Sequence, residues 1–307
     1  MLVFNFLEFF CSAVIIYCSS DFIIKYGKDL ALSIGVSEYF IGLTIIAFGT
    51  SFPELVVNTN ASIIGESIIA YGNIVGSNIA NIALVLSIAV IINVIEPKDF
   101  NFKDILFFLV SAIFLFLFSL DGKLVFYEGF LFIVGFFWYC FNIKNQVLYS
   151  VREKKEKTQF DIFLVLILLF SFMLLIIGSR IFISNAISIA VNIGISKFAV
   201  SLTMVAIGTS LPELAMAIVA SVKKEHDLLI GGIIGSNIMN VLLVLGTSIM
   251  INQINIVINL SSILLMCFLT LIVFLYSFFK VSISRIIGFI LLIIYCTFIY
   301  SNFLLTI

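Results

Sequence analysis

The sequence predicts an all-α polytopic membrane protein whose ten transmembrane helices form two five-helix repeats of inverted topology. Three observations lead to this prediction. The chain is 63% hydrophobic and only 11% charged, whereas soluble proteins are about half apolar and about a quarter charged. It contains ten apolar segments of roughly the 20 residues that cross a bilayer. The first half of the chain also aligns with the second half without a gap.

The predicted spans follow the runs of apolar residues. Those of the first half cover residues 3–26, 38–62, 67–92, 103–120 and 124–144. Those of the second half cover residues 161–186, 197–222, 227–251, 256–279 and 284–304. The first and sixth runs continue toward residues 36 and 195, so we expect long, strongly tilted helices there. The N-terminal run lacks a basic region and a cleavage site, which favours a retained helix over a signal peptide.

Lysine and arginine set the predicted orientation. With the N-terminus outside, all but three of the 16 basic residues fall on the cytoplasmic side, the exceptions being Lys123, Arg180 and Lys197. The count predicts an N-out, C-out protein in the cytoplasmic membrane. The charged segment 146–160 then becomes a cytoplasmic linker between repeats 1–145 and 161–307. Asp21 is expected to reach the interface, and Glu225 to be a solvated loop acid.

The internal repeat appears when the sequence is shifted by 159 positions. Segments 42–90 and 201–249 then share 22 of 49 residues. The motif GTSFPEL (49–55) falls on GTSLPEL (208–214), and GSNIAN (76–81) falls on GSNIMN (235–240). An odd number of spans in each half inserts the second copy the other way up. The two motifs therefore approach the membrane centre from opposite faces, which is the architecture of secondary transporters.

Each motif places four residues on one helix face, at spacings i, i+3, i+4 and i+7. In the first repeat these residues are Ala47, Thr50, Ser51 and Glu54. In the second repeat they are Ala206, Thr209, Ser210 and Glu213. The next helix of each repeat adds a serine and an asparagine at spacing i, i+4, namely Ser77 with Asn81 and Ser236 with Asn240. Glycines at 72, 76, 231 and 235 allow these helices to approach closely.

The chemistry of this set indicates a cation site. Pro53 and Pro212 have no N–H, so each interrupts its helix and frees a backbone carbonyl that something must satisfy inside the membrane. Carboxylates, hydroxyls, amides and carbonyls are hard oxygen ligands, which Ca²⁺ and Na⁺ prefer. Serine and threonine can instead bond to their own helix, and a lone proline can simply kink it. Two glutamate-bearing copies in opposite orientation favour function, because intramembrane acids are rarely structural.

Other function classes fit the residues less well. An intramembrane enzyme is not predicted, because the chain has one histidine, His226, and no HExxH, Ser–His or paired-Asp arrangement. A net charge of −1 gives no indication of nucleic-acid binding. A proton-driven Ca²⁺ antiporter, a gated cation channel and an interaction protein without transport stay open as alternatives. The expected partners are inorganic cations and the lipid bilayer, no cofactor is expected beyond the transported ions, and a monomer is expected to function.

At these motifs the chain resembles the sodium/calcium exchanger family of the calcium/cation antiporter superfamily. The resemblance covers essentially the whole chain and is most specific over 38–91 and 197–250. It implies alternating access and exchange of Ca²⁺ for Na⁺. It implies Ca²⁺ ligands at Glu54, Glu213, Thr50 and Thr209. It implies Na⁺ ligands at Ala47, Ser51, Ser77, Glu54, Ala206, Ser210, Ser236 and Glu213, with Asn81 and Asn240 flanking the centre.

Two positions depart from the pattern of the family. Prokaryotic relatives often carry Asp where this chain has Asn240, and potassium-dependent exchangers use an acid there. Asn240 therefore favours exchange that is independent of K⁺. Gly232 stands where the repeat partner is Asn73 and where the family often has Asn. No consequence of that second departure follows from the sequence.

Overall fold

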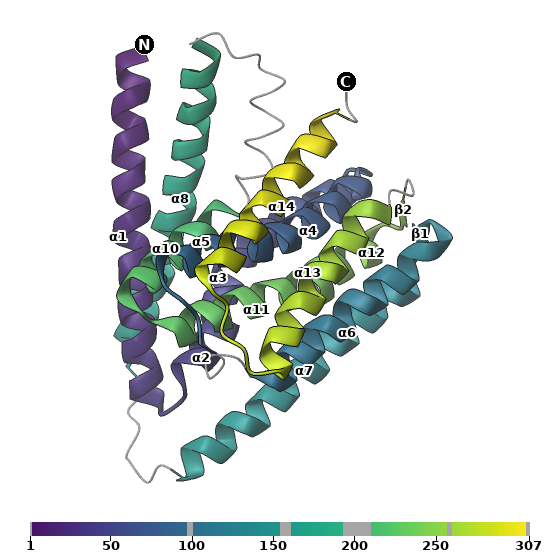
Figure 1. Ribbon diagram of the computed structural model, residues 1–307, viewed down its shortest axis with the longest axis horizontal. Helices are drawn as coiled ribbons and strands as arrows, with labels where there is room; N and C mark the ends of the chain where they lie inside the picture. The colour runs from purple at the N-terminus through teal and green to yellow at the C-terminus, as the bar shows by residue number, and fades with distance from the viewer. Residues whose placement is uncertain (1, 97–100, 154–160, 193–209, 257–259, 305–307) are drawn as a thin grey trace.

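A computed structural model of the chain describes residues 2–96, 101–153, 161–192, 210–256 and 260–304, which are almost entirely helical (Figure 1). The first half contains α1 (Leu2–Ile34), α2 (Glu38–Ile41), α3 (Ala47–Ile63), α4 (Ser67–Ala80), α5 (Ser87–Ile92), α6 (Phe102–Phe118), β1 (Lys123–Leu124) and α7 (Phe126–Glu153). The second half contains α8 (Ile162–Asn192), α10 (Leu211–Lys223), α11 (His226–Met239), α12 (Gly246–Ile251), β2 (Ile254–Asn255), α13 (Leu260–Phe278) and α14 (Arg285–Leu304).

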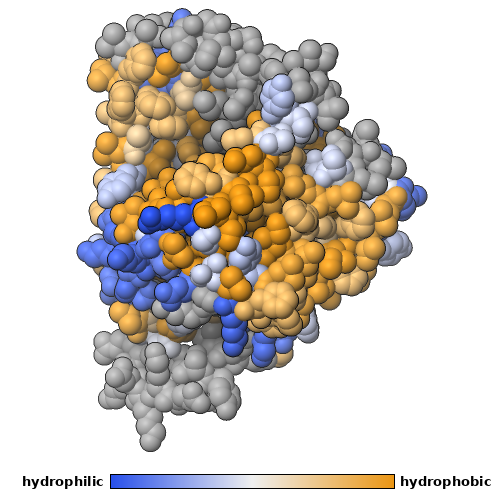
Figure 2. Space-filling model, in the orientation of Figure 1, coloured by the Kyte–Doolittle hydropathy of each residue, from blue (hydrophilic) through white to orange (hydrophobic). Residues whose placement is uncertain are grey.

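In the described part of the chain, eight helical stretches are long and apolar enough to cross a membrane. They coincide with the first six, the eighth and the ninth predicted spans. The tenth corresponds to the apolar part of α14, Arg285–Ser301, which is shorter. The first half of the seventh, 197–222, falls outside the described residues, and its second half corresponds to α10. The exposed large side chains are mostly aliphatic and aromatic, as a lipid-facing surface requires, and Figure 2 shows them over most of the visible face.

Two of these helices are unusually long, as the sequence predicts. α1 has 33 residues and α8 has 31. They pack side by side in opposite directions and stand at one edge of the other helices (Figure 1). The strong tilt expected for them stays a prediction.

The predicted linker 146–160 is partly helical. α7 continues to Glu153 instead of ending at the membrane boundary near residue 144. The physical reason is that charge ends a membrane span without ending a helix. Glutamate, lysine, arginine and glutamine are all strong helix formers in water.

The bounds of the central helices follow the sequence repeat. α4 and α11 start 159 positions apart, at 67 and 226, and end 159 positions apart, at 80 and 239. Each continues into a π-helical segment, Asn81–Leu86 and Asn240–Leu245, and then into α5 and α12. A third π-helical segment, Gly42–Ile46, joins α2 to α3.

Two loop contacts are exchanged by the same shift of 159. Leu124 of β1 pairs with Ile254 of β2, and Ile95 forms an isolated bridge with Ile283. Shifting Leu124 forward gives Ile283, and shifting Ile254 back gives Ile95. A two-fold relation between the halves requires such an exchange of contacts.

Glycines allow α11 to cross the start of the second span at backbone contact. A Cβ atom at Gly235 would overlap the Leu43 carbonyl, and one at Gly231 would overlap the Tyr39 carbonyl. The close approach predicted for these two glycines is confirmed. The segment that Gly72 and Gly76 would face by the repeat, 198–206, lies outside the described residues. The crossing brings α11 and α3 together at the centre of the molecule.

We expect Gly235→Ala to destabilise the protein by about 1–3 kcal/mol, because the added methyl group overlaps backbone atoms that cannot move aside. Gly232→Ala is the matched control, since its Cβ would lie 3.4 Å from Ile46 Cγ2 in ordinary contact. The measurement is the thermal unfolding midpoint of both variants in detergent. Equal midpoints would show that the crossing does not depend on glycine at 235.

Candidate cation-binding site

The predicted ligands lie where three irregular helices meet. π-helical turns are wider than α-helical ones and often occur at functional sites, because they redirect side chains and free backbone groups. Here Ala47 follows directly after the first π-helical segment, and Asn81 and Asn240 are the first residues of the other two. Three of the sequence-predicted residues therefore sit at irregular points of these membrane helices.

The interruption expected at Pro53 lies 7 to 11 residues earlier in the structure, about two to three helical turns before the proline. α3 runs through Pro53 without ending, and the irregular turn is the π-helical segment 42–46. Proline removes only one helical hydrogen bond, and membrane helices tolerate that loss. The Thr50 hydroxyl contacts the carbonyls of Ile46 at 3.1 Å and Ala47 at 3.3 Å, which supplies local polar partners.

In the second repeat, Pro212 lies in the first turn of α10 as described. That turn leaves backbone N–H groups without helical partners, so a residue lacking the N–H fits there without loss. Ser210 is the N-cap residue of α10. The residues directly before it, including the predicted ligands Ala206 and Thr209, lie outside the described residues.

All the predicted ligands that the structure describes are buried. Glu54 and Glu213 are 1% and 6% exposed, and their side chains lie near each other. The other described members are also buried: Ala47, Thr50, Ser51, Ser77, Asn81, Ser210, Ser236 and Asn240. The structure thus brings glutamates from both halves of the chain into one water-poor region.

Many polar atoms of this set lack a hydrogen-bond partner within the described part of the chain. They include both carboxylate oxygens of Glu213 and one of Glu54. They also include the hydroxyls of Ser51, Ser77 and Ser210, both amide atoms of Asn81, and Oδ1 of Asn240. Unpartnered buried acceptors are costly, by about 1–3 kcal/mol each and more for charged groups. A bound cation would satisfy them, because each is a hard oxygen ligand.

Thr50 connects the two halves at this point. Its Oγ1 atom lies 3.2 Å from Oγ of Ser236, on α11, and its side chain lies beside the Glu213 carboxylate. Thr50, Ser236 and Glu213 also line a cavity of about 20 Å³. One water molecule needs a cavity volume of only about 10–15 Å³, so this cavity can hold one water molecule or one small cation.

Asn78 and Asn237 are central residues that the sequence analysis did not assign to the site. Asn78 Nδ2 donates to the backbone carbonyl of Asn237 at 3.3 Å, and Asn240 Nδ2 donates to Asn78 Oδ1 at 3.1 Å. Both Asn78 and Asn237 are fully buried. The available signal was their identity in both copies of the GSN motif. They join the two repeats directly beside the predicted ligands.

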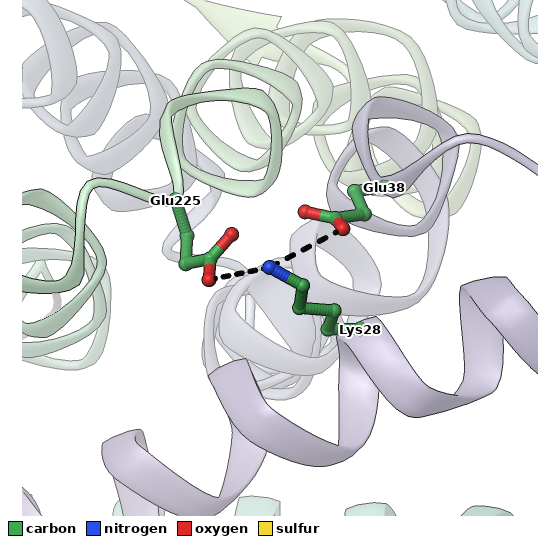
Figure 3. A network of polar contacts seen from close by, with 3 residues as sticks. All are labelled: Lys28, Glu38 and Glu225. Atoms are coloured by element: carbon green, nitrogen blue, oxygen red, sulfur yellow. Dashed lines mark hydrogen bonds and ion pairs between the residues drawn. The ribbon is translucent and has the colours of Figure 1, made fainter.

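One face of α1 closes the cavity. Ile24 lines it, and Asp21 and Lys28 lie on either side of Ile24 on the same helix face. Asp21 pairs with Lys223, and Lys28 Nζ lies 2.7 Å from Glu225 and 3.6 Å from Glu38 (Figure 3). The sequence predicted neither ion pair, because each joins α1 to residues about 200 positions away in the chain. An interfacial Asp21 and a loop position for Glu225 stay predictions, and both side chains are partly exposed.

These partly exposed ion pairs hold α1 to the turn between α10 and α11 and to the start of α2. Each such pair contributes up to about 1 kcal/mol, since water competes for the charges.

A multi-pass helical membrane protein with two buried carboxylates among hydroxyl and amide groups has the features of a cation transporter. The comparison with known families gives the particular family. The profile of the sodium/calcium exchanger protein family matches residues 4–143 and 163–304. The chain belongs to this family of cation exchangers, and the resemblance stated from the sequence is confirmed.

Similar proteins come from bacteria and archaea. The chain is 34% identical over 243 residues to the putative antiporter CaxA of Alkalimonas amylolytica, covering 76% of each chain. It is 30% identical over 294 residues to the sodium/calcium exchanger MaX1 of Methanosarcina acetivorans, covering 81% of this chain and 83% of that one. The solved structure of the sodium/calcium exchanger from Methanococcus jannaschii is similar with a TM-score of 0.86 and 26% identity, over 98% of this chain and 99% of that one.

We expect Asn78→Ala to lower the stability of the folded protein by about 1–3 kcal/mol, because it leaves buried polar groups of the facing repeat without partners. The matched control is Asn142→Ala, whose side chain is partly exposed and donates to the Trp138 carbonyl of its own helix. Thermal unfolding of both variants in detergent measures the difference. An unchanged midpoint for Asn78→Ala would contradict the role of Asn78 in joining the repeats.

Proposed function

We propose that this protein is a secondary antiporter that exchanges intracellular Ca²⁺ for external Na⁺ across the cytoplasmic membrane. The observation that carries the proposal is the pair of buried glutamates, one from each half of the chain, set among hydroxyl and amide groups. Family membership supports exchange of cations that include Ca²⁺. A single chain contains both glutamates, which supports function as a monomer.

In this proposal Ca²⁺ binds between Glu54 and Glu213, with the backbone carbonyls of Thr50 and Thr209 as further ligands. Two carboxylates neutralise a divalent cation, and carbonyls complete an all-oxygen shell. Na⁺ sites use the small and hydroxyl-bearing positions of both repeats and share the two glutamates. These positions are Ala47, Ser51, Ser77, Ala206, Ser210 and Ser236. Asn81 and Asn240 flank the centre.

The glutamate pair makes exchange obligatory in this mechanism. Two negative charges in a low-dielectric region repel each other and have lost their hydration. An empty site is therefore too costly to enclose, whereas a site loaded with one Ca²⁺ or with Na⁺ ions is neutralised. The protein switches between outward-open and inward-open states only when loaded. Because both cations use Glu54 and Glu213, they compete.

Alternating access follows from two inverted five-helix repeats, residues 1–145 and 161–307, in an N-out, C-out protein of ten spans. The proposal is supported by helix bounds that recur after 159 positions and by the two loop contacts that this shift exchanges. In Figure 1, α1 begins and α14 ends toward the same side, and α7 ends and α8 begins toward the other. That arrangement agrees with an even number of spans.

Independence from K⁺ is proposed because Asn240 supplies no charge where potassium-dependent exchangers have an acid. Na⁺ is preferred to H⁺ as the coupling ion, since the buried serines around the glutamates have no evident use in a proton-driven antiporter. A gated channel on the same scaffold would pass ions without a counter-ion.

The first test is radioactive Ca²⁺ uptake into proteoliposomes loaded with Na⁺, K⁺ or acid. We expect uptake only from Na⁺-loaded vesicles, because only that gradient is coupled. We expect Glu54→Gln/Glu213→Gln to abolish it, since two amides cannot neutralise Ca²⁺. Uptake into acid-loaded vesicles would show that H⁺ is the coupling ion. Uptake that does not depend on the ion inside the vesicles would indicate a channel.

Transport is also expected to decline as the medium is acidified from about pH 8 to about pH 5, because protons compete with cations for the two carboxylates. A carboxylate that has bound a proton has lost the charge that attracts Ca²⁺. Initial uptake rates at constant Na⁺ and Ca²⁺ concentrations measure this effect. Raising the Ca²⁺ concentration should restore the rate at low pH, and a flat profile would count against competition.

A further inference from the structure

Asn58 and Asn73 differ from their counterparts in the second repeat, and the two side chains contact each other. The counterparts of Asn58 and Asn73 are Ala217 and Gly232. In the first repeat, Asn73 Nδ2 of α4 donates to Asn58 Oδ1 of α3 at 3.0 Å. In the second repeat, Ala217 and Gly232 both line the cavity beside Glu213. A hydrogen-bonded pair of amides in one half is therefore replaced by open space in the other.

Close packing does not explain the glycine at 232. Gly231 and Gly235 are required by backbone contacts, as described above, whereas a Cβ atom at Gly232 would meet Ile46 Cγ2 at 3.4 Å and the Gly42 carbonyl at 4.0 Å. Both are ordinary contact distances. The missing side chain leaves the cavity of about 20 Å³ open instead.

The amide of Asn58 belongs to a polar face that continues outward from the proposed cation site. Ser51, Glu54, Asn58 and Ser62 lie at spacings i, i+3, i+7 and i+11 on α3, and none is more than 3% exposed. Each has a side-chain polar atom without a hydrogen-bond partner among the described residues: Ser51 Oγ, Glu54 Oε2, Asn58 Nδ2 and Ser62 Oγ. A row of unpartnered buried groups indicates contact with water or a cation in the working protein.

On the equivalent face of α10, the row of unpartnered polar side chains ends at Glu213. The positions are Ser210, Glu213, Ala217 and Ser221. Ala217 has no polar side chain, and the Ser221 hydroxyl already donates to the Ala89 carbonyl at 2.7 Å. The polar face thus extends from Glu54 toward the Ile63 end of α3, but not from Glu213 toward the Lys223 end of α10.

We propose that Asn58, held in place by Asn73, is a further cation-positioning residue on the path between Glu54 and the Ile63 end of α3. An amide oxygen is a hard ligand for Ca²⁺ or Na⁺, and the amide N–H binds the water that such an ion sheds. The opposite path has no such residue, because Ala217 and Gly232 occupy the equivalent positions. The inference rests on the proposed function, and it predicts that the two faces of the exchanger bind Ca²⁺ unequally.

The test is Ca²⁺ uptake measured in right-side-out and in inside-out membrane vesicles. We expect Asn58→Ala to raise the KM for Ca²⁺ about tenfold at one face only, with the KM at the other face and the maximal rate nearly unchanged. Asn73→Ala should change the same KM in the same direction, because it removes the hydrogen bond that orients Asn58. Ala217→Asn/Gly232→Asn should lower the KM at the opposite face.

Asn60→Ala is the matched control, since Asn60 is an exposed residue of the same type on the same helix. Its KM should equal that of the wild type at both faces. A change in KM at both faces for Asn58→Ala, or at neither, would overturn the proposal. A purely structural role would affect both faces together.

A second readout does not depend on transport. In a chain whose five cysteines are replaced, Asn58→Cys should react with a membrane-impermeant cationic thiol reagent from one face, and added Ca²⁺ should slow the reaction. Ala217→Cys should react more slowly. If the wild type shows no Na⁺-driven uptake, the proposed function fails, and the labelling experiment alone then tests the role of Asn58. The proposal for Asn58 is overturned if Asn58→Cys does not react, or if Ca²⁺ does not slow its reaction.

Discussion

Two glutamates that share a buried, low-dielectric region at the meeting point of two half-proteins are the constraint on which the rest of this structure depends. Their carboxylates cannot both be charged there without a counter-charge. In the proposed mechanism a mobile cation supplies that counter-charge within the packed interior. The surrounding hydroxyls and amides are buried, and many have no partner in the described residues, which supports this proposal. Transport would then be the exchange of one neutralising ion for another.

The helices present polar side chains inside the membrane while most backbone groups keep their hydrogen bonds within the helices. π-helical segments place Asn81 and Asn240 at the centre while the helices continue on both sides. Glycines at 231 and 235 let α11 reach the backbone of the second span. Thr50 contacts carbonyls of the preceding turn and also faces Ser236.

Duplication gave the two halves similar helices without making them equivalent. The α1 ion pairs with Glu225 and Lys223 lie at one end of the cavity beside Glu213. The shift of 159 turns Lys28 into Ile187 and Lys223 into Ile64, so neither ion pair has a counterpart in the other half. The amide pair of Asn58 and Asn73 likewise occurs only in the first repeat. A transporter that works between two different solutions gains from such asymmetry, because each face can hold the same ion with a different affinity.

The sequence by itself determined the membrane class, the approximate spans, the repeat and the two glutamates with the hydroxyl and amide residues spaced around them. These features depend on composition and spacing along one chain, which a sequence displays directly. The tertiary structure decided where the second span becomes irregular, how Asn78 joins Asn240, and that Lys28 of α1 pairs with Glu225. Those contacts join residues far apart in the chain, and no local pattern encodes them. The effect of Gly232 is visible only in the tertiary structure, because the cavity beside it is also lined by Ala217 and Ile24, which lie on two other helices.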